Sequence, residues 1–363
     1  MKSLRKVLSL VLLLTLVLSL AACSSGTKPS DKEQEETKQA ETKQTETKQE
    51  ESKQDDSKEN SDLLVAGVVF QEDQFMKLLT IGYQDAAKAA GIKCLVGNTG
   101  NDQAKEAELI NTYMAQKVNG LAIAPLNSES SVAALKKADE AGMKIAVTNI
   151  DLKDAPFIVG GYTSDNHNIG ATTGKAAAKF ISEKLGGKAN IAILQFKSQV
   201  PEQSKARVDG FLEEVQKLGD GIKIVADQDA WLQDKAVAVA GDILTAHPDV
   251  NVIFAANDGG TIGATMAVKN AGKAGECFVF GIDTGEQQIA MLKDSDNILQ
   301  AITGQDPYTM GYKAMESLIK ALKGEDISAT KGKTEIVPGT LLSRDDPDGI
   351  AKFEADLKAK LGG

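Results

Sequence analysis

Short apolar runs alternate with segments of helical spacing from residue 62 almost to the end of the chain. The longer segments place apolar residues three and four positions apart, which is typical of amphipathic helices, and several end at glycine. Predicted strands cover 63–70, 92–96, 120–124, 144–148, 157–159, 190–195, 222–226, 252–255, 277–281 and 298–303. Predicted helices cover 75–90, 102–117, 128–141, 168–185, 203–218, 233–246, 260–271, 287–293 and 308–322.

This alternation predicts an α/β fold with parallel sheets that are covered by helices on both faces. About ten strands are more than one open sheet comfortably holds, and they fall into two similar rounds. The pattern therefore predicts two doubly wound lobes. After them, 324–344 has the pattern of a returning strand and turn, and 347–363 that of a short polar helix.

The segment before this body carries an export signal. Lys2, Arg5 and Lys6 precede Val7–Leu20, a run of 14 residues without a charge. That run is shorter than the roughly 20 apolar residues of a membrane span, so 1–22 is predicted to be a signal peptide. Its end, Leu-Ala-Ala-Cys at 20–23, resembles a bacterial lipobox and implies that Cys23 is lipidated. The alternative is plain secretory cleavage beside an incidental cysteine.

Residues 23–61 have the composition of a tether. Between residues 24 and 61, Ala40 is the one aliphatic residue, and five-residue units such as Glu-Thr-Lys-Gln-Ala repeat from Glu36. A five-residue period builds no apolar stripe on a helix of 3.6 residues per turn. With no apolar surface to bury, we expect a solvated, disordered coil that holds the globular body off a lipid surface.

Composition narrows the class of function. The 363 residues carry a formal net charge of -10. This argues against nucleic acid as a partner and against binding to anionic membranes through a cluster of basic residues. Three cysteines cannot form a disulfide scaffold, and two histidines cannot build a histidine-rich metal site. Cys94 and Cys277 lie in strand-like runs, where we interpret them as small buried hydrophobic residues.

Amide and carboxylate side chains recur after the predicted strands, where ligands bind in open parallel sheets. They include Gln71, Asp73, Asn149, Asp227, Asp229, Asn257, Asp258, Asp283 and Gln305, with Phe75 and the single tryptophan, Trp231, beside them. Such side chains can bind sugar hydroxyls in pairs, and an aromatic face can pack against a sugar ring. Any one of the short polar residues could instead cap the following helix, and Trp231 could belong to the core.

Sequence motifs for catalysis are missing. The chain contains neither Gly-x-Ser-x-Gly nor His-Glu-x-x-His. Residues 169–176 imitate a phosphate-binding loop but lack its first glycine and the Ser or Thr after Lys175. We therefore expect a protein that is not an enzyme and that needs no cofactor and no metal.

Four stretches carry a family resemblance: Ala-Arg-Val-Asp-Gly-Phe at 206–211, Leu-Thr-Ala-His-Pro-Asp-Val at 244–250 leading into Ile-Phe-Ala-Ala-Asn-Asp at 253–258, Val-Phe-Gly-Ile-Asp at 279–283, and Ala-Ile-Thr-Gly-Gln-Asp-Pro-Tyr-Thr-Met-Gly at 301–311. From about 62 to 344 the chain resembles the type I periplasmic-binding proteins, in the ribose- and galactose-binding branch that feeds ABC importers.

The resemblance implies two lobes joined by three crossovers near Thr163, Gln305 and Val337, with a sugar bound in the cleft between them. The first lobe would be 62–163 plus 306–337 and the second 164–305 plus 338–345, followed by a helical tail at 346–363. Sugar-binding roles would fall on Asp73, Phe75, Asn149, Arg207, Trp231, Asn257, Asp283 and Gln305. Met76 and Ile150 depart from the family pattern, which often has an aromatic residue and an arginine there.

The expected function is that of a monomeric, lipid-anchored receptor on the outer face of a bacterial cell membrane. It would capture a monosaccharide and deliver it to the permease subunits of an ABC importer. One alternative is a sensor that presents its ligand to a chemoreceptor or a histidine kinase. Another is a secreted carbohydrate-active enzyme that uses a carboxylate pair such as Asp73 and Asp283.

Overall fold

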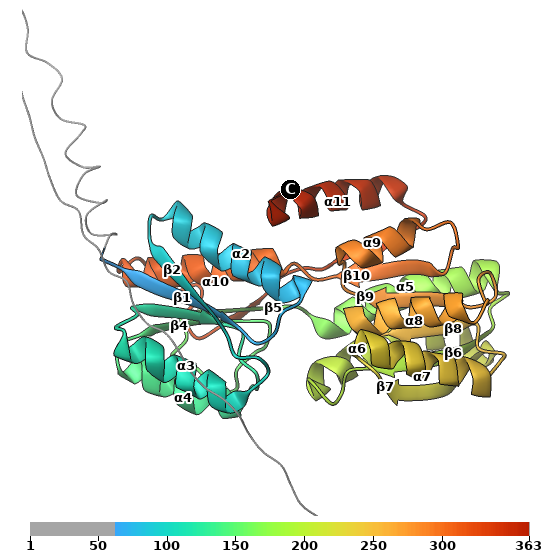
Figure 1. Ribbon diagram of the computed structural model, residues 1–363, viewed down its shortest axis with the longest axis horizontal. Helices are drawn as coiled ribbons and strands as arrows, with labels where there is room; N and C mark the ends of the chain where they lie inside the picture. The colour runs from blue at the N-terminus through green and yellow to red at the C-terminus, as the bar shows by residue number, and fades with distance from the viewer. Residues whose placement is uncertain (1–61, 363) are drawn as a thin grey trace, which may run out of the picture. The chain divides into compact units, whose positions relative to one another are not determined.

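Two six-stranded sheets form the body of the protein, as the computed structural model of residues 62–362 shows (Figure 1). The predicted signal peptide, Cys23 and the predicted tether lie outside these residues. Helices cover both faces of each sheet, as expected for parallel strands that are buried on both sides. The predicted α/β architecture of two doubly wound lobes is confirmed.

The first sheet has the strand order β11-β5-β4-β3-β1-β2, and all neighbouring strands are parallel. Its strands are β1 (Leu64–Val69), β2 (Lys93–Asn98), β3 (Gly120–Ile123), β4 (Lys144–Thr148), β5 (Gly160–Thr163) and β11 (Thr334–Ile336). One face packs against α2 (Gln74–Ala89) and α10 (Pro307–Leu322), the other against α3 (Gln103–Ala115) and α4 (Ser130–Glu140).

The second sheet has the order β12-β10-β9-β8-β6-β7, and only β12 runs antiparallel to its neighbour. Its strands are β6 (Ala189–Gln195), β7 (Ile222–Asp229), β8 (Val252–Ala255), β9 (Phe278–Ile282), β10 (Leu299–Gly304) and β12 (Thr340–Ser343). One face packs against α5 (Asn166–Lys184) and α6 (Pro201–Val215), which a 3₁₀ turn (Gln216–Gly221) extends. The other packs against α7 (Gln233–Ala246), α8 (Asp258–Asn270), α9 (Glu286–Lys293) and α11 (Pro347–Leu361).

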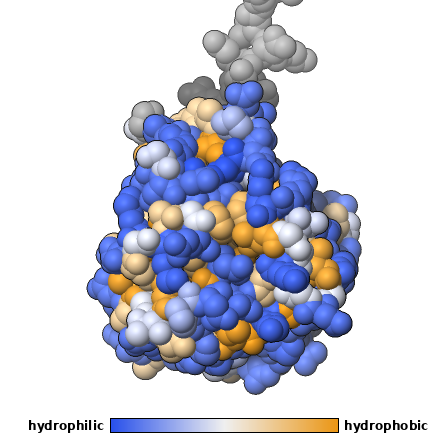
Figure 2. Space-filling view, turned by 90° about the vertical axis from the view of Figure 1, so that its right-hand side faces the viewer, coloured by the Kyte–Doolittle hydropathy of each residue, from blue (hydrophilic) through white to orange (hydrophobic). Residues whose placement is uncertain are grey.

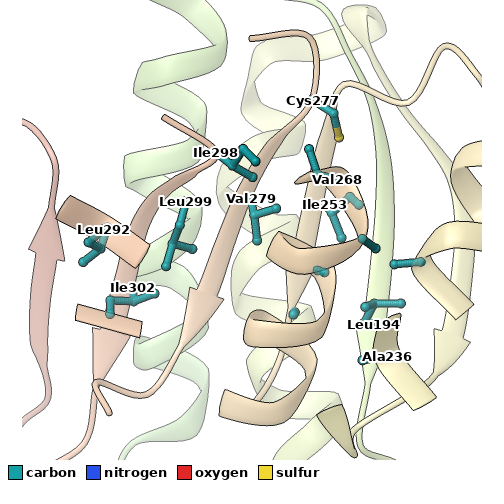
Figure 3. Packing of buried hydrophobic residues seen from close by; sticks show 14 of the residues in the cluster. Leu194, Ala236, Ile253, Val268, Cys277, Val279, Leu292, Ile298, Leu299 and Ile302 are labelled. Atoms are coloured by element: carbon teal, nitrogen blue, oxygen red, sulfur yellow. The ribbon is translucent and has the colours of Figure 1, made fainter. Parts of the chain in front are cut away.

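Strand alternation divides the core of each lobe into two layers. In β1, Val65 and Val69 face α2 and α10, whereas Ala66 and Val68 face α3 and α4. Figure 3 shows one layer of the second lobe, where strand residues such as Val279 meet helix residues such as Val268. Cys277 is fully buried in this layer, as predicted. Cys94 is half-buried, and both are free thiols.

The chain passes between the two sheets three times. It leaves the first sheet after β5 to form α5, returns after β10 to form α10, and crosses again between β11 and β12. Because both lobes are completed only by later segments, neither is a continuous piece of chain. Three connections side by side are the arrangement that allows a hinge between lobes.

Two predicted elements were placed wrongly. The strand expected at 157–159 is instead β5, Gly160–Thr163, whose glycines weaken the sequence signal for a strand. Those glycines are needed for packing, because a Cβ on Gly161 would lie 2.6 Å from Thr334 Oγ1 on β11. The strand expected to end at 226 continues to Asp229, so Asp227 and Asp229 belong to β7 and do not follow it.

The surface of the second lobe mixes polar and apolar residues. On the face drawn in Figure 2, hydrophobic residues lie scattered among hydrophilic ones. Among residues 62–362, no helix is long and apolar enough to cross a bilayer.

Candidate ligand-binding crevice

A crevice between the two sheets collects polar side chains from both lobes. The first lobe contributes Asp73 and Phe75 from the start of α2, which follows β1, and Asn149 from the end of β4. In the second lobe, β8, β9 and β10 end near Asn257, Asp283 and Gln305. Arg207 reaches the same crevice from α6. The structure therefore brings together seven of the eight residues that the sequence singled out.

Two strand ends carry the same unusual backbone conformation. Asn149 follows β4 with φ 71°, and Asp283 follows β9 with φ 73°, both in the left-handed region that non-glycine residues rarely adopt. Each backbone N–H donates to the strand beside it, from Asn149 to Tyr162 O and from Asp283 to Thr303 O, at 2.9 Å. Asn and Asp tolerate this conformation better than other side chains do. The two lobes thus turn the chain in the same way at corresponding points, and strain at such points is common at functional sites.

Arg207 is a buried cation, with only 3% of its surface exposed. Its Nε donates to Asn166 Oδ1 and its Nη1 donates to Ala256 O, both at 2.9 Å, and its guanidinium lies 5.0 Å from the centre of the Phe196 ring. Burial lowers the pKa of Arg207, while the carboxylates of Asp283 and Asp258 oppose that change. These contacts fix the plane of the guanidinium at the crevice wall.

Glycines on α5 and α6 set the position of Arg207. A Cβ on Gly170 would lie 1.9 Å from the Arg207 carbonyl oxygen, and one on Gly210 would lie 2.1 Å from His167 O. The two helix backbones therefore touch at these glycines. The glycines of the segment 169–176 therefore serve helix packing. This agrees with the sequence, which lacks the residues that a phosphate-binding loop requires.

Asp283 and its neighbours form a hydrogen-bonded group. Gln305 Nε2 donates to Asp283 Oδ1 at 2.9 Å, and the backbone N–H of Asp258 donates to Asp283 Oδ2 at 3.2 Å. Arg207 Nη1 lies 3.9 Å from the same Oδ2. Asp283 is thus oriented by an amide and a main-chain donor beside a cation.

Two of the crevice residues also cap helices, which is the alternative role that the sequence left open for them. Asp73 Oδ1 accepts from Met76 N at 2.8 Å and caps α2, and Asn257 Oδ1 accepts from Gly260 N at 3.2 Å and caps α8. Both residues still line the crevice. Their positions at helix starts hold them rigidly, so capping and lining are compatible roles.

The crevice is acidic. Desolvation raises the pKa of the Asp73 carboxyl, and burial together with the nearby Asp283 and Asp73 raises that of Asp258 to about 7. Arg207 is the cation that faces this group. Three carboxylates against one guanidinium favour neutral ligands that donate hydrogen bonds and disfavour anions.

Hydrogen bonds join the two lobes across the crevice. Gln199 Nε2 on the second lobe donates to Gln71 Oε1 on the first at 3.0 Å, and Gln203 Nε2 donates to Asn149 O at 2.9 Å. In this arrangement of the lobes the crevice has a volume of about 60 Å³. Because its walls belong to different lobes, rotation at the crossovers would change this volume.

Comparison with known proteins identifies the family. The model of the periplasmic binding protein domain matches residues 66–326. The chain belongs to this family. Its members are binding proteins rather than enzymes. The crevice and the three crossovers thus belong to a protein whose family consists of binding proteins.

Several relatives of this periplasmic binding protein have stated ligands. A ribose import binding protein from Salmonella typhimurium is 31% identical over 256 residues, covering 70% of this chain and 83% of its own. A D-allose-binding periplasmic protein from Escherichia coli is 30% identical over 254 residues, covering 67% and 78%. An ABC transporter solute binding protein from Actinobacillus succinogenes, solved with D-allose, is 28% identical with a TM-score of 0.71, covering 79% of this chain and 99% of its own.

Trp231 is the exception among the predicted site residues. In this binding protein it does not line the crevice; its Nε1 donates to Ser198 Oγ at 3.1 Å, and its ring packs partly against the core of the second lobe. Phe196 is an aromatic residue of the second lobe that does line the crevice. Phe196 comes directly after β6. The residues after this strand are absent from those that the sequence analysis considers at strand ends, and this is why Phe196 was missed.

Sequence reasoning also missed several polar residues of the binding protein's crevice. Gln71 and Asp258 follow strands, but the sequence predicts no sugar-binding role for them. Gln199 lies in the turn before α6 and Gln203 in its first turn, and neither follows a strand directly. Within the described residues, no group of three or more His, Cys, Asp and Glu side chains is placed to hold a metal ion.

Proposed function

We propose that this chain is an extracytoplasmic receptor that binds a monosaccharide between its lobes and delivers it to the permease of an ABC importer. The observation that carries the proposal is the convergence of Asp283, Gln305 and Arg207 from one lobe with Asp73 and Asn149 from the other on a single crevice. The named ligands of the relatives, ribose and D-allose, are of this class.

The chemistry of the crevice supports a sugar. Each hydroxyl group donates one hydrogen bond and accepts others, so carboxylates, amides and a guanidinium can bind several hydroxyls at once. Phe75 and Phe196 come from opposite lobes and supply apolar faces for the C–H side of a ring. Contacts from both lobes to one ligand would favour the arrangement in which the lobes are together. The permease would then recognise that arrangement, and no bond of the sugar would change.

Lipid anchoring at Cys23 is part of the proposal. The support is the lipobox-like Leu-Ala-Ala-Cys at 20–23, followed by a polar segment long enough to separate the body from a bilayer. Radiolabelled palmitate should be incorporated into the protein in bacterial cells, and the Cys23→Ala variant should lose both the label and membrane association. Full labelling of the variant would exclude Cys23 as the site.

A thermal-shift panel of pentoses, hexoses and inositols tests sugar binding. A sugar at 100 times its Kd should stabilise the protein by about 2.7 kcal/mol. Asp283→Asn keeps the shape of the side chain but replaces one acceptor oxygen by a donor amide, and it should remove most of that shift. The matched control is Asp165→Asn, because Asp165 caps α5 and asparagine caps a helix equally well.

Three outcomes are informative. Stabilisation by one or a few sugars, lost in Asp283→Asn and kept in Asp165→Asn, supports the proposed site. Equal shifts in both variants place the sugar elsewhere on the chain. If the sugar recovered after incubation is chemically altered, the protein is an enzyme and the proposal of a pure receptor is wrong.

A further inference from the structure

A second cavity of about 210 Å³ adjoins the crevice and is called the side cavity here. Four residues line both spaces: Phe75, Asp258, Asp283 and Gln305. A ligand held by Asp283 and Gln305 in the crevice therefore has this additional space directly beside it. The crevice alone is small compared with the roughly 300–1,000 Å³ of pockets that hold larger small molecules.

The far wall of the side cavity is the C-terminal helix. Phe353, Asp356, Leu357 and Lys360 of α11 line it. The helix is held firmly by the second lobe, where Ile350 and Leu357 are buried.

Polar contacts hold both ends of this wall. Glu354 pairs with Lys293 of α9 at 2.6 Å. At the other end, Lys360 Nζ lies 3.5 Å from Asp306 Oδ1 and 4.9 Å from the centre of the Tyr308 ring. The helix thus contacts both α9 of the second lobe and the start of α10 in the first lobe.

The lining of the side cavity has the chemistry of a sugar site. Phe75, Tyr308 and Phe353 supply aromatic surface for a ring. Gln74 also lines the cavity, and its Nε2 is buried without a hydrogen-bond partner in the described part of the chain. A buried donor left unpaired costs about 1–3 kcal/mol, so a ligand acceptor at this point would recover that energy.

The charge of the side cavity restricts what can enter. Four carboxylates line it, on Asp258, Asp283, Asp306 and Asp356, against the single cation Lys360, which already pairs with Asp306. A uronate or a phosphorylated sugar would meet repulsion there. A neutral ring with hydroxyl groups would not.

We propose that the side cavity is a second subsite, and that the ligand carries a second neutral, hydroxylated ring beyond the one in the crevice. This inference rests on the proposed sugar-binding function. It extends the proposed ligand from a monosaccharide to a disaccharide or a glycoside whose first ring occupies the crevice. It also gives α11 a role in choosing the ligand, because the helix would contact only the second ring.

Calorimetric titration of the full chain tests the inference with matched pairs of sugars: D-glucose with maltose and cellobiose, D-galactose with melibiose, and D-xylose with xylobiose. At least one two-ring sugar should bind about tenfold more tightly than its parent monosaccharide. Phe353→Ala and Asp356→Ala should reduce that ratio of affinities several-fold. Lys352→Ala, at an exposed position of α11 that does not line the cavity, should leave it unchanged.

The possible failures can be told apart. If monosaccharides bind but every two-ring sugar binds more weakly, or if the ratio is the same in Phe353→Ala, Asp356→Ala and the unmodified protein, the second subsite is wrong and the proposed receptor stands. If no sugar of either length binds, the proposed function fails as well. Asp356 is exposed, so its substitution tests the cavity even if Phe353→Ala disturbs the packing of α11.

Discussion

At the scale of single residues, the crevice is built from side chains whose ordinary properties have been altered by their position. Asn149 and Asp283 sit in the left-handed region, and Arg207 is buried. Each of these features costs stability, and each is offset by fixed neighbours such as Ala256 O and Gln305. Such costs are expected where a binding surface must be ready before its ligand arrives.

Asp258 gives a prediction about pH. Its pKa is raised to about 7 in the folded protein, whereas an unfolded chain would titrate it near 4. Between these values the folded state holds a proton that the unfolded state has lost, so this group makes the protein less stable as pH rises toward 7. Asp283, Asp73 and Arg207 are the charged groups that face it.

Asp258→Asn removes this titration and should therefore stabilise the protein more at pH 8 than at pH 5, by on the order of 2 kcal/mol. The free energy of unfolding in urea, measured for both proteins at both pH values, gives the difference directly. A difference between the two proteins that stays the same from pH 5 to pH 8 would show that Asp258 does not titrate in this range.

At the scale of secondary-structure elements, the contact between α5 and α6 links stability to binding. Gly170→Ala would force the Arg207 carbonyl away from a Cβ only 1.9 Å distant. Relieving that clash should cost about 1–3 kcal/mol, and the movement of α6 would carry Arg207 with it. Sugar affinity should therefore fall by about tenfold or more, because small displacements of binding groups have large effects.

Gly241→Ala is the control for this prediction. Gly241 lies inside α7, and a Cβ there would meet nothing within 4 Å. The substitution should stabilise the protein by about 0.5–1 kcal/mol, since alanine favours a helix over glycine, and sugar affinity should not change. Chemical denaturation and titration calorimetry measure both effects. Equal behaviour of the two variants would contradict the helix contact.

Most elements were predictable because their signals are local. Apolar runs and helical spacing located nearly every strand and helix, and the positions after strands pointed to Asp73, Asn149 and Asp283, which line the crevice. The sequence could not show how deeply α6 sits, because that depends on glycines of a different helix. It misplaced β5 because glycines needed for contact with β11 and α10 hide a strand. It also predicted Trp231 as a crevice residue, whereas the crevice is lined by Phe196 and not by Trp231.

At the scale of the whole molecule, two glutamines connect the lobes. Gln199 and Gln203 both lie at the crevice side of the second lobe and donate to Gln71 and to Asn149 O on the first. These bonds exist only while the lobes are together. They should therefore shift the equilibrium between separated and joined lobes toward the joined state. The affinity for a ligand that contacts both lobes depends on this equilibrium.

Gln203→Ala removes the bond to Asn149 O and should lower sugar affinity by about two- to tenfold, the range expected for one hydrogen bond. Small-angle scattering separates this effect from the loss of a direct ligand contact. If the bond joins the lobes, the sugar-free variant should have a larger radius of gyration than the unmodified protein, and sugar should reduce the difference. Gln228→Ala, on exposed edge strand β7, is the matched control and should change neither quantity. Weaker binding with an unchanged radius would mean that Gln203 contacts the sugar itself and does not hold the lobes together.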